Sequence, residues 1–467
     1  PKNSTILKQG VLRLCRALCF FYIERKKHIF PLYKEQKTCY HIAEQTFGKK
    51  ALFMKDRLIL HCDLNNFFAS VECLSHPEWR DVPMAVGGSS EERHGIILAK
   101  NEKAKHFGVR TAEALWEARQ KCPDLLIVPP HYDDYVFYSK KVRAIYEEYT
   151  DRVEPFGMDE CWLDVTGSTL LFGGGGEIGC EIKERVKRET GLTISVGVSF
   201  NKVFAKLASD MKKPDAMTVI GRENFRSVVW SLAAQEMIGV GKATLRRLNS
   251  IGVYTLGELA KTDPKMLRLT FGKMGEQLWQ AANGLDSTPV LSKNEIPPAK
   301  SVGRSVTGKY DLKNNDEVAA VMLYLTGKVA SSLRDNNVMA TSVQIHIRDE
   351  KLLVRECQAP LSQPTRIVEM LFSLGMELFV SNWSWKSSVR SIGIRACGLV
   401  PENCASQYSL FYSTGRYDKL EALEAQVYEI CRKYGKNALF RASTMRIAVP
   451  NSDTPAFNDV RYMTKEG

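Results

Sequence analysis

Three acids in two short segments of this sequence occupy positions which suggest that they bind a metal ion. In LILHCDLNNFFASVE, residues 58–72, an apolar run typical of a buried strand leads to Asp63. In MDECWLDVT, residues 158–166, Asp159 and Glu160 are adjacent and precede residues that favour a strand. A buried carboxylate costs free energy unless its charge is compensated, and a metal ion is a suitable partner. A lone aspartate at the end of a strand would more often cap the next helix, so the interpretation depends on the second segment.

The acids of the second segment are predicted to lie at or near the tip of a hairpin. Pro155 and Gly157, in RVEPFGM at 152–158, mark a turn just before them. Carboxylates from two strands that are distant in sequence could then converge on one face, as a phosphoryl-transfer site with two metal ions requires. Mg²⁺ prefers oxygen ligands and keeps several waters, so two or three carboxylates and the substrate phosphates suffice. We therefore predict a site for two Mg²⁺ ions.

These segments, together with SFNKVFAKLASDMKKPD at 199–215, resemble the Y-family, or translesion, DNA polymerases. The motifs occur in the order of that family, and the resemblance runs from about Met54 to about Val400. It implies a multidomain α+β fold, a right-hand polymerase with a ferredoxin-like palm, small helical fingers, a helix-hairpin-helix thumb and a C-terminal α/β little finger. The expected bounds are 1–53 for a basic N-terminal extension that precedes the usual family start, 54–66 and 129–230 for the palm, 67–128 for the fingers, 231–290 for the thumb, 291–300 for a linker, 301–400 for the little finger and 401–467 for a C-terminal tail.

The resemblance also implies an activity, the addition of deoxynucleotides to a DNA primer 3′ end by a two-metal mechanism. Translesion synthesis and DNA repair without proofreading are the implied roles. Asp63 and Asp159 would bridge or flank the two Mg²⁺ ions, and Glu160 would bind the ion that activates the primer hydroxyl. The backbone carbonyl of Leu64 would help to hold the ion on the nucleotide side. Positioning and charge neutralisation would dominate the contribution of the protein.

Two aromatic residues and lysines from two segments are the expected contacts of the incoming nucleotide. By resemblance, the ring of Phe68 occupies the space where a ribonucleotide 2′-hydroxyl would sit, and it excludes that hydroxyl by steric clash. Phe67 would pack beneath the base or sugar. Lys213 would reach the β- and γ-phosphates, and Lys206 is a second candidate from within the same predicted helix.

One expected nucleotide segment departs from the common family pattern. In GIILAKNEKAKHFGVRTAEALWEA at 95–118, Glu102 and Lys105 stand where the family usually has Tyr and Arg. Lys105 keeps a positive charge without the two-pronged geometry of arginine, and it remains a predicted nucleotide contact. Glu102 would repel phosphate if it pointed inward; pairing with a neighbouring lysine, such as Lys100 or Lys103, is the alternative.

Two regions are expected to bind the DNA backbone. In EMIGVGKATLRRLNSIGVYTLGELA at 236–260, Gly239 and Gly241 form a turn before a helix that begins near Lys242. This resembles a helix-hairpin-helix, whose backbone N–H groups bind phosphate without reading bases; a glycine turn with no ligand is the alternative. In residues 301–400, four strands and two helices, near 315–335 and 364–381, are expected. Candidate phosphate contacts there are Arg304, Lys309, Arg390 and Arg395, although exposed strand lysines and arginines also serve solubility.

The peptide QYSLF, residues 407–411, resembles the short motif with which bacterial polymerases bind the sliding clamp. Gln407 would enter a polar pocket, and Leu410 and Phe411 would fill an apolar one. Packing of an amphipathic stretch back onto the protein is the alternative. Tethering to a clamp would raise the local concentration of the enzyme at DNA.

Composition agrees with a DNA partner only weakly. The net charge of the 467 residues is +12, but residues 1–53 contain 11 Lys or Arg and 3 Asp or Glu, which leaves only +4 for the rest. The 12 cysteines include no CxxC pair, so we expect reduced thiols in a cytoplasmic protein. The run VLRLCRALCFFYI at 11–23 is too short to span a bilayer. We expect a monomer with no membrane partner.

Two other functions remain open on the sequence. A nucleotidyl cyclase or related palm enzyme also uses two carboxylates on a ferredoxin-like core, but the helix-hairpin-helix and the clamp-like peptide argue against it. A non-catalytic DNA-binding and clamp-binding adaptor could retain the fold, but the intact Asp63, Asp159 and Glu160 argue against that.

Overall fold

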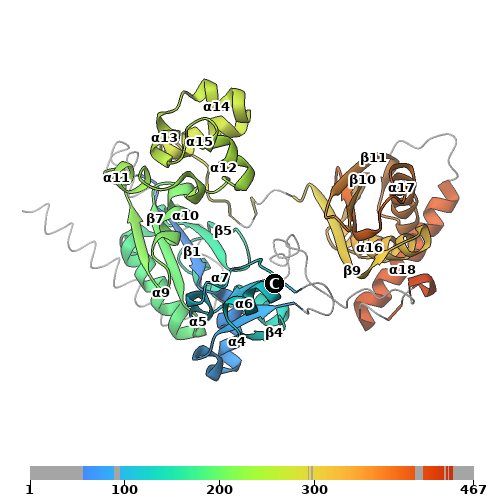
Figure 1. The fold of residues 1–467 in the computed structure, drawn as a ribbon, viewed down its shortest axis with the longest axis horizontal. Coiled ribbons are helices and arrows are strands. Elements are labelled where there is room, and N and C mark those ends of the chain that lie inside the picture. Colours follow the sequence, from blue (N-terminus) through green and yellow to red (C-terminus); the bar gives the residue numbers. More distant parts are fainter. Residues whose placement is uncertain are drawn as a thin grey trace, which may run out of the picture. The chain divides into compact units, whose positions relative to one another are not determined.

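The computed structural model describes residues 56–88, 95–292, 294–295, 298–404, 414–435, 438–439 and 441–444 (Figure 1). The N-terminal extension predicted for 1–53 and the clamp-like peptide with Gln407, Leu410 and Phe411 lie outside this set. In the described ranges, no helix is both long and apolar enough to cross a membrane. The nine cysteines of these ranges are all free thiols.

A five-stranded sheet with the order β5-β6-β1-β7-β8 carries the predicted carboxylates. Its strands are β1 (Ile59–Leu64), β5 (Val153–Pro155), β6 (Glu160–Asp164), β7 (Ile194–Ser199) and β8 (Met217–Ile220). The helix α7 (Tyr132–Glu147) precedes β5, and α9 (Gly175–Thr190) lies between β6 and β7. The first four strands and these two helices follow the βαββαβ order predicted for a ferredoxin-like palm, and β8 adds a parallel edge strand. Two short helices, α8 (Thr169–Phe172) and α11 (Phe225–Val229), complete this region.

Strand alternation decides which side chains of β1 face which helices. Leu60, Cys62 and Leu64 belong to a core that includes apolar residues of α7 and α9. The alternate residues, His61 and Asp63, face the helix α10 (Lys202–Met211) on the other side of the sheet, where they contact its side chains. The catalytic candidates therefore lie between the sheet and α10.

A glycine lets α10 lie close against the sheet. A Cβ atom added to Gly197 of β7 would lie 2.0 Å from the carbonyl oxygen of Ala205 and 2.5 Å from the backbone nitrogen of Ser209. Both atoms are backbone, so no side-chain rearrangement could make room. At its start, α10 is capped by Asn201, whose side chain accepts a hydrogen bond from the N–H of Phe204 at 2.8 Å. The close packing at Gly197 and the cap by Asn201 together fix the position of α10, the helix that carries Lys206.

The region expected to form small helical fingers also contains a sheet. Its helices are α4 (Phe67–Ser75), α5 (Glu102–His106) and α6 (Leu115–Lys121). The three strands β2 (Met84–Gly87), β3 (Ile97–Lys100) and β4 (Leu126–Val128) pair in the order β3-β2-β4. The purely helical expectation was therefore incomplete, because these runs of three or four apolar residues show strand character only once they pair.

Helices alone form the region predicted as the thumb (Figure 1). They are α12 (Lys242–Asn249), α13 (Leu256–Lys261), α14 (Pro264–Phe271) and α15 (Lys273–Ala282). Gly239, in the turn before α12, has φ +91°, a conformation that favours glycine. Gly241 is the N-cap residue of α12, as the helix-hairpin-helix motif predicts.

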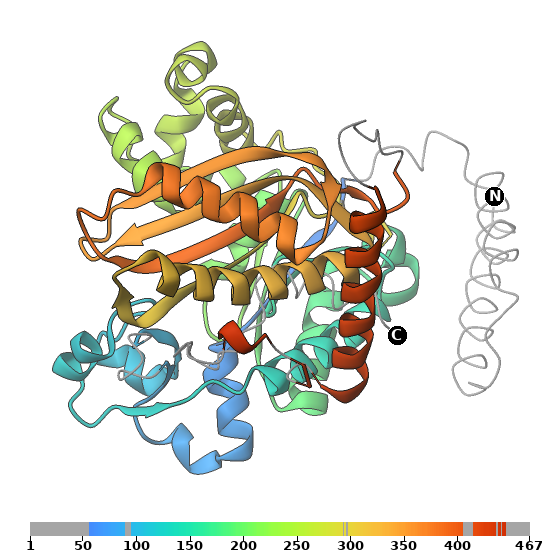
Figure 2. The same cartoon turned by 90° about the vertical axis from the view of Figure 1, so that its right-hand side faces the viewer.

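A second βαββαβ unit follows and has a helical face and an open face. Its sheet has the order β11-β10-β12-β9, and α16 and α17 lie together on one side of it (Figure 2). The elements are β9 (Ser301–Leu312), α16 (Asn315–Asp335), β10 (Val338–Asp349), β11 (Val354–Thr365), α17 (Val368–Asn382) and β12 (Val389–Cys397). The short strand β13 (Val400–Pro401) pairs with β10, and α18 (Thr414–Tyr434) comes last among the long helices. The four strands and two helices predicted for 301–400 are all present.

Candidate active site

Asp63 and Glu160 lie directly opposite each other on neighbouring strands. They form a register pair of the antiparallel strands β1 and β6, so their side chains share a face of the sheet. Asp159 precedes β6 in the turn of the β5–β6 hairpin, and its backbone carbonyl accepts a hydrogen bond from the N–H of Leu64 at 2.9 Å. The hairpin predicted from Pro155 and Gly157 thus brings the two acids to the end of β1.

Two lysines of α10 and the following turn neutralise these carboxylates. Lys206 Nζ lies 2.9 Å from Glu160 Oε1 and 3.2 Å from Asp63 Oδ2. Lys213 Nζ lies 2.8 Å from the same Asp63 oxygen. Asp210, one helical turn beyond Lys206, pairs with both lysines. The sequence interpretation placed Lys206 and Lys213 near this site but did not predict that they would bind the acids.

Charge and burial shift the ionisation of the groups around the site. Burial, reinforced by the negative charges of Asp63 and Glu160, raises the pKa of Asp159 to about 6. Burial would lower the pKa of Lys206, but the charges of Asp63 and Glu160 outweigh it and raise that pKa. Lys206 is therefore protonated at neutral pH, as a cation among acids should be.

A buried histidine leaves one carboxylate oxygen without a hydrogen-bond donor. Ser209 Oγ donates to the carbonyl of Lys206 at 2.7 Å, so His61 Nδ1, 2.8 Å away, donates to Ser209 Oγ. The second ring nitrogen, Nε2, then presents a lone pair 3.5 Å from Glu160 Oε2, and neither atom has a hydrogen-bond partner within the described residues. Burial, with Lys206, also lowers the pKa of His61 to about 3, so the ring is neutral.

The chemistry of this donor set fits a divalent cation. Three carboxylates supply hard oxygen ligands, and Glu160 Oε2 keeps a free lone pair in a buried position. In this structure the lysines lie between the carboxylates. In the described part of the chain, no group of three His, Cys, Asp or Glu residues is arranged so that it could hold a metal ion. The site therefore suits Mg²⁺ by ligand type, while in this structure Lys206 contacts two of its three carboxylates.

Asn65 joins the end of β1 to the turn that carries Lys213, and the sequence interpretation missed it. Its side-chain oxygen accepts hydrogen bonds from the N–H of Asp215 at 2.8 Å and from Thr193 Oγ1 at 3.2 Å. Its side-chain nitrogen donates to Ser195 Oγ at 2.8 Å. Asn65 is buried, so these bonds are shielded from water. The sequence offered one indication of this role, since Asn65 is an amide only two residues after the predicted catalytic Asp63.

Asn65→Leu should lower the free energy of unfolding by about 2–4 kcal/mol, because it removes three hydrogen bonds and takes this partner from the buried Ser195 hydroxyl and from two partly buried donors. Urea unfolding would measure this. Ser195→Ala removes only one of the three bonds and should cost about 1 kcal/mol. Equal stability of Asn65→Leu and the wild type would show that water replaces the amide and that Asn65 does not hold the turn.

The two adjacent phenylalanines take different positions at the start of α4. Phe67 is buried in the core that lines β1. Phe68 is partly exposed and stacks on Tyr135 of α7, with ring centroids 4.2 Å apart and an interplanar angle of 8°. The hydroxyl of Tyr135 donates a short hydrogen bond to the buried carboxylate of Glu72. The position of the Phe68 ring is thus supported by a second ring that is itself anchored.

Glu102 points toward the turn between β1 and α4. Asn66 Nδ2 donates to Glu102 Oε1 at 3.0 Å, and Lys105 Nζ lies 3.5 Å from the same oxygen. Glu102 thus pairs with a neighbouring lysine, as the alternative expected, but this lysine is Lys105 and not Lys100 or Lys103. Lys105 is about half exposed, so its weak pairing with Glu102 leaves it accessible.

The predicted phosphate contacts of the second βαββαβ unit divide between the two faces of its sheet. Arg395 is exposed and belongs to the register row of Gln344 and Gly303, on the face opposite the helices. Lys309 is exposed and Arg390 is partly exposed. Arg304 instead donates to Ser332 Oγ of α16 at 3.1 Å, on the helical face. We therefore withdraw Arg304 as a phosphate contact, since strand alternation turns it toward α16.

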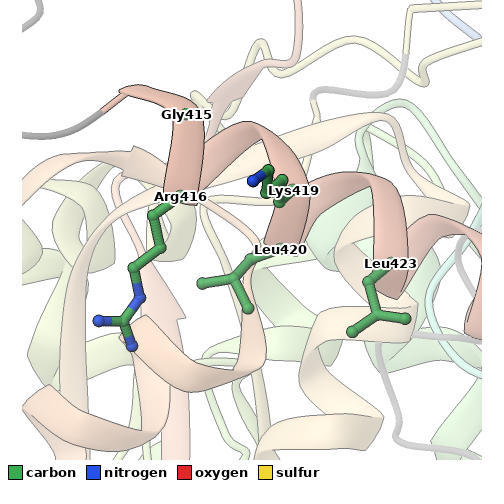
Figure 3. Close-up of a pocket in the computed structure, with 5 residues that line it drawn as sticks. All are labelled: Gly415, Arg416, Lys419, Leu420 and Leu423. Carbon is green, nitrogen blue, oxygen red and sulfur yellow. The ribbon is translucent and has the colours of Figure 1, made fainter.

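The pocket drawn in Figure 3 is unrelated to the acidic site. Its five lining residues all belong to α18, and they are Gly415, Arg416, Lys419, Leu420 and Leu423. None of them is an acid, and none is a predicted nucleotide or DNA contact. The candidate active site is therefore defined by the carboxylates and lysines between the sheet and α10, not by this pocket.

Comparison with family models covers most of the folded regions. The model described as the impB/mucB/samB family matches residues 62–210, and the model of its C-terminal domain matches residues 299–410. A model described as the thumb domain of DNA polymerase iota matches residues 235–286. The three matches follow the order palm and fingers, thumb, little finger.

Individual proteins agree with these matches. DNA polymerase IV of Acetivibrio thermocellus is 48% identical over 379 residues, which cover 81% of this chain and 95% of that protein. DNA polymerase IV 1 of Bacillus subtilis is 34% identical over 408 residues, covering 86% and 97%. A solved chimeric Y-family DNA polymerase has the same fold, with a TM-score of 0.65, 24% identity, and coverage of 74% of this chain and 99% of its own. The chain therefore belongs to the impB/mucB/samB family, the Y family of DNA polymerases that includes bacterial DNA polymerase IV.

Proposed function

We propose that this protein is a DNA-directed DNA polymerase that extends a primer 3′ end with deoxynucleoside triphosphates. The observation that carries the proposal is the register pair of Asp63 and Glu160, with Asp159 in the adjoining turn, on a ferredoxin-like sheet. Family membership supports the same reaction. The proposal extends to translesion synthesis and DNA repair without proofreading, by a monomer in the cytoplasm, as the resemblance to the Y family implies.

The acids would hold two Mg²⁺ ions. Asp63 and Asp159 would contact both ions, Glu160 the ion on the primer side, and the Leu64 carbonyl the ion on the nucleotide side. When bound, the ions would lower the pKa of the primer hydroxyl and neutralise the charge that develops on the phosphates. The sheet, α10 and Asn65 position the carboxylates and Lys213 before substrate arrives, which limits the reorganisation required during reaction.

Other side chains would orient the nucleotide. Lys213 would turn from Asp63 to the β- and γ-phosphates once Mg²⁺ satisfies that carboxylate, and Lys105 would add positive charge from the fingers. Phe68, supported by Tyr135, would face the sugar, and Phe67 would keep the floor of the site apolar.

The DNA and the clamp would contact other regions. The turn of Gly239 and Gly241 and the side chain of Lys242 would bind backbone phosphates. Arg395, Lys309 and Arg390 would provide further phosphate contacts from the little finger. Gln407, Leu410 and Phe411 would bind the sliding clamp.

The test is primer extension by the wild-type protein on an undamaged template with Mg²⁺, offering one dNTP at a time. Incorporation of the nucleotide complementary to the template, abolished by EDTA, is the expected result. Cyclic nucleotide formed without primer or template would identify a cyclase-type enzyme instead. DNA binding by the folded protein without any extension would identify an adaptor.

Phe68→Ala should raise the incorporation of ribonucleotides relative to deoxynucleotides by roughly 10–200-fold, since it removes the steric conflict with the 2′-hydroxyl. The measurement is the ratio of kcat/KM for a dNTP and the matching NTP. Val71→Ala is the control, because Val71 is buried on the same helix and is not a proposed nucleotide contact, so its truncation should alter stability and leave the ratio within about threefold. An unchanged ratio in Phe68→Ala would remove Phe68 from the role of sugar gate.

A further inference from the structure

Lys206 occupies the position where cations would be required in the proposed active site. Its ammonium group lies within 3.2 Å of an oxygen of each of three acids, Glu160, Asp63 and Asp210. A lysine ammonium has three N–H donors, so the three carboxylates account for its full donor capacity. The side chain is only 14% exposed. It is therefore held by the protein's own acids and leaves no donor for a phosphate.

The acids need this charge when no metal ion is bound. Asp63 is 5% exposed, and it faces Glu160 across a strand pair where like charges are destabilising. At effective dielectric constants near 20, charges about 4 Å apart interact by several kcal/mol. Lys206 meets both carboxylates and cancels much of this repulsion. Lys213 shares the Asp63 oxygen but not Glu160, so only Lys206 among these two lysines bridges both acids.

The lysine can leave the acids without movement of its helix. The backbone of α10 at Ala205 and Ser209 packs closely against Gly197, so a shift of the helix would disturb that packing. Lys206 is instead attached through a flexible side chain. Asp210, one turn along α10 and more exposed, already contacts Nζ at 3.2 Å. Rotation of the side chain toward Asp210 would free Asp63 and Glu160 while keeping the ammonium paired.

We propose that Lys206 is an internal counter-cation that holds Asp63 and Glu160 together in the metal-free protein and that a divalent ion must displace. The inference rests on the proposed function, because it assumes that these acids are the metal ligands. It assigns Lys206 a role distinct from a phosphate contact: it weakens cation binding by the free protein and keeps the ligands in place until DNA and nucleotide add their own negative charge.

The experiment is titration of the full chain with Mn²⁺ alone, in the absence of DNA and nucleotide, followed by the electron paramagnetic resonance signal of free Mn²⁺. Lys206→Gln should bind Mn²⁺ on the order of tenfold more tightly than wild type, because competition and charge repulsion are both removed. Lys202→Gln is the matched control. Lys202 lies on the same helix and its side chain is similarly shielded, 10% exposed against 14% for Lys206, but its ammonium pairs with Glu154, so its loss should leave the Mn²⁺ affinity within about twofold.

Thermal unfolding provides a second readout that does not require tight binding. Lys206→Gln should melt at a lower temperature than wild type in EDTA and gain more from added Mn²⁺. Lys206→Arg keeps the positive charge and should bind Mn²⁺ no more tightly than wild type, so it gives a folded comparison if the glutamine variant is unstable.

The outcomes separate this inference from the proposed function. Equal or weaker Mn²⁺ binding by Lys206→Gln, or an equal gain in Lys202→Gln, would overturn the displacement of Lys206. The proposed metal site would still stand if Asp159→Ala reduced Mn²⁺ binding. Mn²⁺ binding that is indifferent to Asp159→Ala in both the wild-type and the Lys206→Gln background would overturn the metal site and the lysine inference together.

Discussion

Asp159→Ala should lower primer extension at least about 10³-fold while the protein stays folded and binds DNA. Removal of a group that acts on the transition state typically costs this much or more. The backbone contact between Asp159 and Leu64 uses the carbonyl of residue 159, which alanine retains. The loss should therefore come from the missing carboxylate and not from a disturbed hairpin.

The Asp159→Ala substitution that lowers activity should leave the stability of the fold unchanged or raise it. The pKa of Asp159 is raised to about 6 by burial and by Asp63 and Glu160, so its ionised form is disfavoured in the folded state. An ionised carboxylate with a raised pKa destabilises the fold at pH values above that pKa, and the cost disappears as pH falls toward the unfolded value. At pH 7 in EDTA, Asp159→Ala should thus unfold at the same or higher urea concentration than wild type.

Asp164→Asn is the matched control for this measurement. Asp164 lies on the same face of β6 as Glu160, four residues further along, and caps the turn at Thr166 through Oδ1. Asparagine keeps that oxygen, so extension should stay within about threefold of wild type. Substantial extension by Asp159→Ala, or an equal loss in Asp164→Asn, would mean that Asp159 is not a ligand of the reaction.

Gly197→Ala should lower the free energy of unfolding by about 3 kcal/mol or more and reduce extension as well. The new Cβ would lie 2.0 Å from a backbone oxygen of α10, so the helix itself must move, which is costlier than repacking a side chain. Displacement of α10 would carry Lys206 and Asp210 away from the carboxylates. Urea unfolding and primer extension on the same preparation would report both effects.

Gly176→Ala is the control for the loss of a glycine. Gly176 lies in the first turn of α9, and its nearest neighbour to an added Cβ is Met217 Cε at 3.9 Å, an ordinary contact. Since alanine favours helix, the change should be neutral or stabilising by up to about 1 kcal/mol. If Gly197→Ala changed the free energy of unfolding and primer extension as little as Gly176→Ala, the close packing of α10 on β7 would not be required for stability or activity.

The local chemistry of the site could be predicted from the sequence by itself. The apolar run before Asp63 determined a strand, and the turn residues before Asp159 and Glu160 determined a hairpin, because these signals depend on near neighbours in the chain. The motifs then identified the Y family, whose membership the comparisons confirmed. The resemblance to that family then predicted the ferredoxin-like order of the palm and the four strands and two helices of the little finger.

The contacts between side chains of different helices and strands could be known only from the three-dimensional structure. The partners of Lys206, the anchoring of the Lys213 turn by Asn65 and the hydrogen bond of Arg304 to α16 all join residues far apart in sequence. Strand alternation limits each side chain to one of two faces, but it does not say which helix covers that face or how closely. Here the absence of a side chain at Gly197 sets that distance, and with it the position of a lysine among the catalytic acids.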